Sequence, residues 1–211
     1  MVTYLGVLLG AYLIGALPFS VWMGLAFGVD IRKMGSGNPG ATNVVRNVGW
    51  GPGIIAFLLD VAKGSAPALA AKYLADQQGF GYIPGLLPQD HALYAGLMAI
   101  VGHTLSPFLK FKGGKGVATG LGALLGTAWL AGVIGFGMFL VFLALTRYVS
   151  VASVVGAASA AVAALMLGLS PAVSVAYVLV AVYIIVKHRA NFERLRKGEE
   201  PKIGKKAAPP P

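Results

Sequence analysis

Residues 117–146 read VATGLGALLGTAWLAGVIGFGMFLVFLALT, a run of 30 residues without a charged side chain. A single helix of this length would extend about 45 Å, whereas the hydrocarbon core of a bilayer is about 30 Å thick. Divided evenly into two helices, the run would give two short spans of about 15 residues each, and the glycine and threonine at Gly126 and Thr127 mark the region where we expect the break. The number of membrane spans in the chain depends on which of these two arrangements is correct.

The composition of the 211-residue chain indicates a membrane protein. Hydrophobic residues make up 57% of it and charged residues 11%, whereas a soluble domain typically has about 25% charged residues. Because few polar side chains remain to face water, lipid must cover most of the surface. The net charge of +10 is compatible with nucleic acid or with an anionic lipid surface, and the apolar composition favours the lipid surface, so we expect no nucleic acid partner. The chain has no cysteine, which excludes disulfides and thiolate metal ligands.

Apolar segments suited to spanning helices flank the long run on both sides. They are residues 4–27, 52–74, 92–109, 149–167 and 171–186. We expect Pro18 to kink the first of them, and Pro171 suits the first turn of the last, where a backbone N–H is not needed.

Positive charge decides the number and direction of the spans, because cytoplasmic loops carry an excess of Lys and Arg. No cation precedes the first span, and Arg32 and Lys33 follow it, which predicts an external N-terminus. With a break near Gly126, 15 of the 17 cations fall on the cytoplasmic side, and without the break this asymmetry collapses. The cytoplasmic cations are then Arg32, Lys33, Arg46, Lys110, Lys112, Lys115, Arg147, Lys187, Arg189, Arg194, Arg196, Lys197, Lys202, Lys205 and Lys206.

We therefore predict an all-α polytopic membrane protein with seven transmembrane helices, the N-terminus outside and the C-terminus cytoplasmic. Residues 1–196 would form a single seven-helix domain. Residues 197–211 would form a basic, proline-ended disordered tail.

The first cytoplasmic segment, residues 34–46, combines three glycines with several polar side chains. Glycines let the backbone adopt positive φ, and successive N–H groups in such turns form a nest for anions. A flexible connecting turn is the alternative, but this segment uses many polar groups in a chain that has few. The candidate residues are Ser36, Gly37, Asn38, Gly40, Thr42, Asn43 and Arg46.

The second cytoplasmic segment, residues 103–116, ends in a glycine-rich turn directly before an expected helix, an arrangement that binds phosphate. It is not a nucleotide-type phosphate loop, because Val117 stands where that loop needs Ser or Thr. Positive charge on the cytoplasmic side would explain the lysines but not the glycines between them. The candidate residues are His103, Lys112, Gly113, Gly114, Lys115 and Gly116.

Two further pairs of polar residues stand out. His188 and Asn191 are three residues apart and share a helical face, and histidine is suited to proton transfer near neutral pH. A basic helix end at the lipid headgroups would explain the neighbouring cations but not these two residues. Asp60 and Lys63 lie inside the second span, where charges are costly. They form either a structural pair, or a site at which Lys63 reaches an anionic headgroup.

These segments together resemble the bacterial acyl-phosphate:glycerol-3-phosphate acyltransferase family, the PlsY type. The resemblance extends in order through nearly the whole chain. It rests on residues 35–43, on Asp60 with Lys63 and Gly64, on His103 with residues 108–116, and on residues 188–193.

The resemblance implies transfer of a fatty acyl group from acyl phosphate to the 1-hydroxyl of glycerol 3-phosphate, giving lysophosphatidic acid and phosphate in the bacterial cytoplasmic membrane. It implies a site that faces the cytoplasm, with catalytic Ser36, Arg46, His188 and Asn191 and structural Asp60 and Glu193. The substrate-binding residues would be Gly37, Asn38, Gly40, Thr42, Asn43, Lys63, His103, Lys112, Gly113, Gly114, Lys115 and Gly116.

The mechanism expected from these residues is direct transfer without an acyl-enzyme. Acyl phosphate is already activated, so the enzyme mainly has to position both substrates and stabilise developing charge. We expect no metal ion, no cofactor and no obligate protein partner.

Three other functions compete with this prediction. A transporter of an organic phosphate would also need cations, but it predicts polar groups on both sides of the membrane. A CDP-alcohol phosphotransferase needs clustered aspartates, whereas the aspartates here are scattered along the chain. A purely structural lipid-binding protein would need neither His188 nor Asn191.

Overall fold

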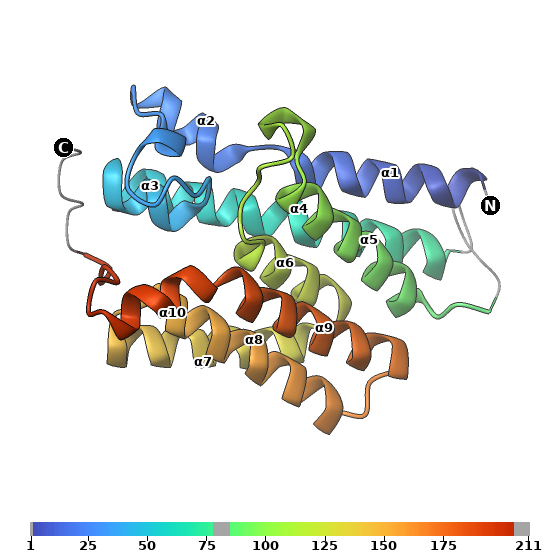
Figure 1. The fold of residues 1–211 in the computed structure, drawn as a ribbon. Helices are drawn as coiled ribbons and strands as arrows, with labels where there is room; N and C mark the ends of the chain where they lie inside the picture. The colour runs from blue at the N-terminus through green and yellow to red at the C-terminus, as the bar shows by residue number, and fades with distance from the viewer. Residues whose placement is uncertain (1, 78–84, 205–211) are drawn as a thin grey trace.

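A computed structural model describes residues 2–77 and 85–204 of the chain, and every regular element within these residues is helical (Figure 1). This confirms the predicted all-α class. The elements are α1 (Val2–Ala16), α2 (Phe19–Ala26), the 3-10 helix η1 (Ile31–Lys33), α3 (Ala41–Asn47), α4 (Trp50–Asp76), α5 (Pro88–Thr104), η2 (Pro107–Leu109), α6 (Val117–Thr127), α7 (Trp129–Thr146), α8 (Val149–Met166), α9 (Pro171–Lys187) and α10 (Arg189–Arg196).

Five helical segments among the described residues are long and apolar enough to cross a membrane. A sixth results if α9 and α10, which meet at a 49° bend, are counted as one span. Helix α6 has 11 residues and extends about 16 Å, which is shorter than the apolar core of about 30 Å. The predicted number of seven spans, and the direction of the two termini, remain predictions.

The uncharged run of residues 117–146 is divided into two helices, as predicted. Helix α6 ends at Thr127 and α7 begins at Trp129, with Ala128 in a non-helical conformation (φ −145°, ψ 85°) between them. The carbonyl of Leu124 near this break accepts hydrogen bonds from the Ala128 N–H (2.8 Å) and from the Tyr177 hydroxyl of α9 (3.1 Å). A polar contact from a third helix therefore stabilises the break.

The expected kink at Pro18 is a complete interruption between α1 and α2. Proline has no N–H to donate, so carbonyls near it lose their helical partners. The Ala16 carbonyl instead accepts from the Ser106 hydroxyl (2.6 Å), and the Leu17 carbonyl accepts from the Lys63 ammonium (2.7 Å). The interruption thus ties the first span to α4 and to the segment that follows α5.

The helices form two groups with α6 between them. Figure 1 shows α1, α4 and α5 side by side in one group and α7, α8 and α9 in the other. Helices α4 and α6 approach closely because glycine occupies both sides of their contact. A Cβ at Gly64 would collide with the Thr119 carbonyl, and a Cβ at Gly122 would collide with the Val61 carbonyl.

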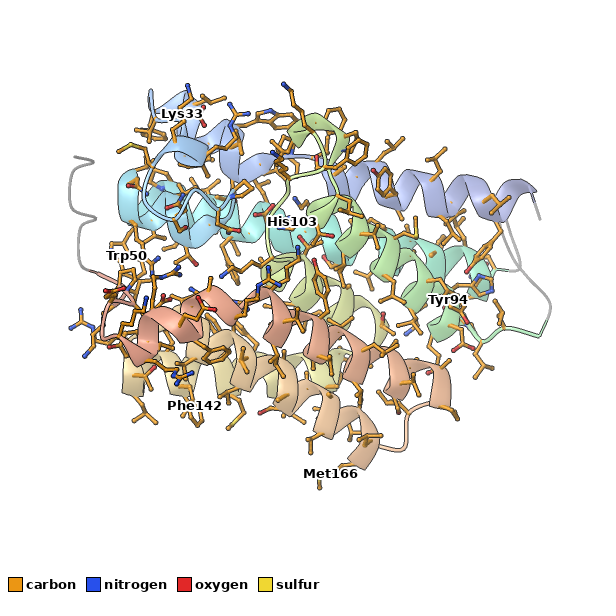
Figure 2. The ribbon with its side chains drawn as sticks, in the orientation of Figure 1. Lys33, Trp50, Tyr94, His103, Phe142 and Met166 are labelled. Carbon is orange, nitrogen blue, oxygen red and sulfur yellow. The ribbon has the colours of Figure 1, made fainter. Side chains whose placement is uncertain are left out.

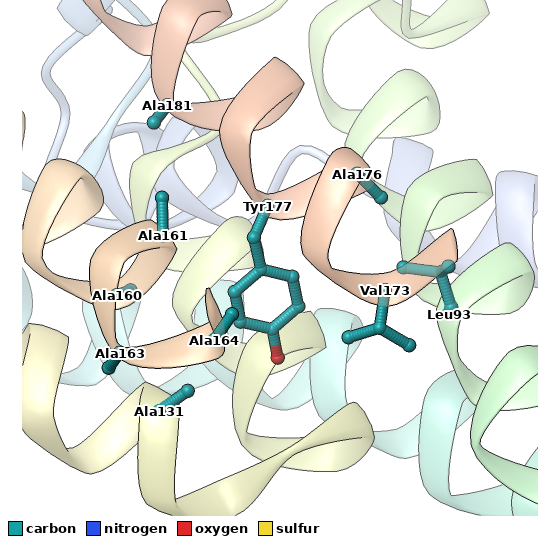
Figure 3. Packing of buried hydrophobic residues seen from close by; sticks show 10 residues of the cluster. All are labelled: Leu93, Ala131, Ala160, Ala161, Ala163, Ala164, Val173, Ala176, Tyr177 and Ala181. Atoms are coloured by element: carbon teal, nitrogen blue, oxygen red, sulfur yellow. The ribbon is translucent and has the colours of Figure 1, made fainter. Parts of the chain in front are cut away.

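Small side chains fill the interior of the second group. Tyr177 packs among Ala131, Ala160 and Ala164 (Figure 3), which allows the backbones of α7, α8 and α9 to approach one another. Large apolar side chains point outward instead: Met166, on the outer surface in Figure 2, is 83% exposed. This distribution is the one that lipid favours.

Candidate active site

A cavity of about 440 Å³ lies where α6 meets the second group of helices. Its polar end is lined by the three segments that the sequence analysis selected, which are far apart in the chain. Its other end is apolar and extends between the helices. The apolar lining includes Phe57, Leu121, Phe136, Phe139, Tyr177 and Val180. One cavity can therefore hold an anionic group and a hydrocarbon chain at the same time.

Most of the predicted site residues line this cavity. They are Ser36, Gly37, Asn38, Gly40, Thr42, Asn43, Arg46, His103, Lys112, Gly113, Lys115, Gly116, His188 and Asn191. Asp60, which we expected to be structural, also lines it. The structure does not bring Lys63, Gly114 or Glu193 to the cavity wall, and Glu193 is exposed.

The glycine-rich segment between η1 and α3 is held in place by Asn43. The Asn43 side chain is 1% exposed, and its amide group donates to the carbonyls of Ile31 (2.7 Å) and Met34 (3.1 Å). Its Oδ1 accepts from the Asn47 amide (2.8 Å). Asn43 therefore supports the segment, while Ser36 is exposed on the segment's surface.

Arg46 extends from α3 into the cavity wall. Its Nη2 donates to the Pro201 carbonyl (2.9 Å), whereas its Nε is buried and has no hydrogen-bond partner within residues 2–77 and 85–204. Burial lowers the pKa of Arg46, yet a guanidinium stays protonated in proteins. A half-buried cation with a buried, unused N–H is suited to a phosphate or carbonyl oxygen.

The loop between η2 and α6 folds back onto the end of α5. The Gly113 N–H donates to the Thr104 carbonyl (3.1 Å), and the Gly114 N–H donates to the His103 carbonyl (3.3 Å). A Cβ at Gly113 would collide with the His103 carbonyl, and a Cβ at Gly114 would collide with the His103 imidazole. Close packing on α5 thus explains both glycines, whether or not an anion binds to this loop.

Lys115 lies at the end of this loop and contacts α10. Its ammonium donates to Oδ1 of Asn191. Burial lowers the pKa of Lys115 to about 8, and the nearby positive charges of Arg194 and Arg46 act in the same direction, while Glu200 opposes them. Lys115 is thus a cation that loses its proton at a lower pH than an ordinary lysine.

His188 ends α9 at the bend before α10 and is 3% exposed. Its Nδ1 lies 2.7 Å from the Ile184 carbonyl. Because a carbonyl can only accept a hydrogen bond, this contact assigns the proton of a neutral ring to Nδ1. Nε2 then has a free lone pair, as a general base requires.

Asp60 and Lys63 form a buried ion pair, 2.8 Å apart, in α4. Ser20 donates to the other Asp60 oxygen (2.7 Å), and the Lys63 ammonium donates to the Leu17 carbonyl (2.7 Å). His103 Nδ1 lies 3.9 Å from Asp60, and Figure 2 shows His103 in the interior of the molecule. Of the two alternatives for this pair, this geometry suits the structural one, because the Lys63 ammonium contacts Asp60 and Leu17 and does not line the cavity.

Glu200 is a cavity residue that the sequence analysis missed. It is 5% exposed, and its carboxylate accepts from Ser150 (2.9 Å), Asn191 (2.6 Å) and Arg194 (2.8 Å). It was missed because it lies in the tail that we expected to be disordered. The signal available in the sequence was the acidic pair Glu199 and Glu200 within an otherwise basic segment.

Within the described part of the chain, no group of three His, Asp or Glu side chains is placed to hold a metal ion. The cavity instead offers a cluster of cations next to a histidine and an apolar channel. This combination suits an amphiphile with an anionic, phosphate-like head.

Residues 5–198 match the family model described as glycerol-3-phosphate acyltransferase. The chain belongs to this family. Among the glycerol-3-phosphate acyltransferases similar to it, that of Synechococcus elongatus is 41% identical, with 98% of this chain and 97% of the relative covered. Glycerol-3-phosphate acyltransferase 1 of Deinococcus radiodurans is 40% identical, with 98% of each chain covered.

Two crystal structures of PlsY (YgiH), an integral membrane glycerol 3-phosphate acyltransferase, share the fold of this family member. The glycerol 3-phosphate form has a TM-score of 0.84 and 35% identity, and covers 95% of this chain and 96% of PlsY. The lysophosphatidic acid form has a TM-score of 0.81 and 35% identity, with 95% of each chain covered. The predicted family is confirmed, and the protein is a membrane-embedded acyltransferase.

Proposed function

We propose that this acyltransferase moves a fatty acyl group from acyl phosphate to the 1-hydroxyl of glycerol 3-phosphate, as a step of phospholipid biosynthesis. The observation that carries the proposal is one cavity with a cationic end and an apolar end. The cations suit the phosphates of both substrates, and the apolar end suits the acyl chain. The crystal forms of PlsY named for glycerol 3-phosphate and lysophosphatidic acid support the acceptor and the product.

We further propose that the cavity opens to the cytoplasm from a bacterial cytoplasmic membrane. Glycerol 3-phosphate is soluble in water, so the site that binds it must be open to the compartment that supplies it. The cations at the polar end, including Arg46, Lys115 and Arg194, support this orientation, because Lys and Arg gather on the cytoplasmic side. A transporter is not favoured, because the family consists of acyltransferases.

The proposed chemical step is a direct transfer. The oxygen of the 1-hydroxyl attacks the acyl carbonyl carbon, and the bond from that carbon to the bridging phosphate oxygen breaks. Phosphate leaves with the electron pair of that bond. The hydroxyl proton goes to Nε2 of His188 or to a phosphate oxygen of a substrate. Because phosphate is already a good leaving group, positioning and charge stabilisation account for most of the catalysis.

We assign the residues to roles on the basis of where they lie. Ser36 and Arg46 border the glycine-rich segment, and we assign them to the acyl phosphate, where Ser36 positions the donor or completes an oxyanion site. Lys115 and Asn191 contact each other across the cavity wall, and we assign them to glycerol 3-phosphate. His188 then lies at the polar end with its base position free.

Phosphate release from palmitoyl phosphate, with and without glycerol 3-phosphate, tests the proposed function. The purified protein in lipid nanodiscs should release phosphate at a rate that depends on the acceptor, and lysophosphatidic acid should form in equal amount. Release that is independent of the acceptor, or no release at all, would refute the assignment.

Two further results would bear on the mechanism. Trapping an acylated Ser36 that reacts onward at the rate of turnover would contradict direct transfer. A His188→Ala variant that keeps most of kcat would exclude His188 as the base and leave the proton to a phosphate oxygen.

A further inference from the structure

We propose that Glu200 is a positioning residue of the phosphate site, and that residues 199–203 form a strap that holds it there. The inference rests on the proposed function, since it concerns the subsite assigned to glycerol 3-phosphate. We call these residues the C-terminal strap.

The C-terminal strap is attached to the helices at several points besides Glu200. The Pro201 carbonyl accepts from Arg46 of α3 (2.9 Å). Ile203 exchanges two hydrogen bonds with Arg147 at the end of α7, at 2.8 and 3.1 Å. The Lys202 ammonium lies 5.4 Å from the centre of the Tyr148 ring. The strap therefore connects α3, the turn between α7 and α8, and α10 across the polar end of the cavity.

The Glu200 carboxylate determines which way the Asn191 amide faces. Nδ2 of Asn191 donates to Glu200 (2.6 Å), and Oδ1 of the same amide accepts from the Lys115 ammonium. The reverse orientation would point an amide oxygen at a carboxylate and an NH₂ group at an ammonium, both of which are repulsive. Glu200 thus positions Lys115 through Asn191, without a direct contact to it.

Glu200 also supplies negative charge among the groups that face Lys115. Those groups are Arg46 from α3, Arg194 from α10, His188 at the end of α9 and Glu200 from the strap. Two of them are permanent cations that oppose the charge on Lys115, and the carboxylate offsets them. An ammonium at Lys115 is what a phosphate needs, so Glu200 supports binding by geometry and by charge.

The test compares Glu200→Gln with Glu199→Gln. Both remove one negative charge from the strap, but Glu199 is exposed and its side chain makes no hydrogen bond or ion pair within residues 2–77 and 85–204. We expect Glu200→Gln to raise KM for glycerol 3-phosphate about tenfold, the effect of a lost charge-assisted contact. We also expect the alkaline limb of kcat/KM to move to lower pH, while Glu199→Gln keeps the wild-type values.

Inorganic phosphate binding, measured by calorimetry over the same pH range, separates this inference from the proposed function. Weaker phosphate binding by Glu200→Gln at alkaline pH would support the positioning role even if the wild type used neither substrate. A wild-type KM and pH profile in Glu200→Gln would overturn it. A higher KM together with an unmoved alkaline limb would also overturn it, because loss of structure alone would then suffice.

Discussion

The protonation state of the Lys115 side chain should determine how the activity of the enzyme depends on pH. Burial lowers its pKa to about 8, so the ammonium predominates below that pH and disappears above it. If the ammonium binds phosphate, kcat/KM for glycerol 3-phosphate falls as the pH rises through about 8. Lys115→Arg should move this fall to higher pH, because a guanidinium does not lose its proton in this range. Initial rates from pH 6 to 10, about the range in which Lys115 titrates, would check this.

Lys115→Ala tests the assignment of the acceptor to the same subsite. We expect a higher KM for glycerol 3-phosphate and an unchanged KM for palmitoyl phosphate, because the variant removes a contact to one phosphate. An unchanged KM for glycerol 3-phosphate would place that substrate elsewhere in the cavity.

The buried ion pair of Asp60 and Lys63 should contribute to the free energy of unfolding of the protein. Lys63→Met leaves the Asp60 carboxylate buried without its cation, which costs about 3–5 kcal/mol when one partner of a buried pair is removed. Thermal unfolding in detergent should show a clearly lower unfolding temperature for Lys63→Met. Adding Asp60→Asn should partly restore the unfolding temperature. Lys72→Met, in the same helix but only half-buried, is the control and should unfold near the wild-type temperature.

At the scale of elements, the contact between α4 and α6 decides where the loop of Lys115 is placed. Gly122→Ala would bring a methyl group onto the Val61 carbonyl, which belongs to the backbone and cannot rotate away. We expect a loss of about 1–3 kcal/mol from this overpacking. Gly137→Ala in α7 is the matched control, because a Cβ at that position meets nothing within 4 Å. Equal melting temperatures for the two variants would contradict the tight contact.

Helix α9 contributes Tyr177 to the deep, apolar part of the cavity. A second cavity of about 10 Å³ shares the lining residues Leu124, Tyr177 and Val180 with the first, so these side chains separate the two. Tyr177→Ala should remove the barrier and favour longer acyl phosphates, whereas Tyr177→Phe keeps the ring and should keep the preference. The ratio of kcat/KM for stearoyl and myristoyl phosphate measures this. The same ratio in both variants would show that the acyl chain does not reach Tyr177.

The positions of the helix ends were the part of the fold most accessible from the sequence. The interruption at Pro18 follows from a missing N–H. The charge asymmetry required a break within residues 117–146, and the observed break at Ala128 lies within two residues of the predicted Gly126 and Thr127. The apolar wall of the cavity was not accessible in this way. Apolar residues such as Phe136 and Tyr177 suit lipid, a neighbouring helix and a bound acyl chain equally well, because all three environments are apolar. The residue type therefore does not predict which of them the side chain faces.

The sequence predicted most residues of the polar wall but not the contacts between them. Polar residues in a chain that has few of them are conspicuous, which identified Arg46, Lys115, His188 and Asn191. Their neighbours across the fold were not accessible, because contacts between distant segments depend on packing that periodicity does not encode. Glu200 was missed for this reason: its carboxylate is held by three partners, Ser150 of α8 and Asn191 and Arg194 of α10, and the acidic pair in its own segment does not reveal them.

At the scale of the whole molecule, the direction of the chain in the membrane is open to a direct test. The chain has no cysteine, so single cysteines can be introduced at exposed positions without first removing native ones. In intact spheroplasts, a membrane-impermeant maleimide should label Leu167→Cys, between α8 and α9, and should leave Lys197→Cys unlabelled until the membrane is broken. Labelling of Lys197→Cys in intact cells would reverse the predicted orientation and the proposed cytoplasmic site.

The C-terminal strap has a consequence for the order in which the protein becomes active during its synthesis. A chain is made from its N-terminus, and segments fold as they emerge. Within residues 2–77 and 85–204, all ten α-helices precede Glu200 along the chain, so these helices are translated before the residue that positions the phosphate site. In a nascent chain whose helices are inserted while the ribosome still holds the C-terminal strap, the apolar part of the cavity is formed. The polar end still lacks Glu200. Insertion would then come first and acyl transfer second, in one irreversible sequence set by translation.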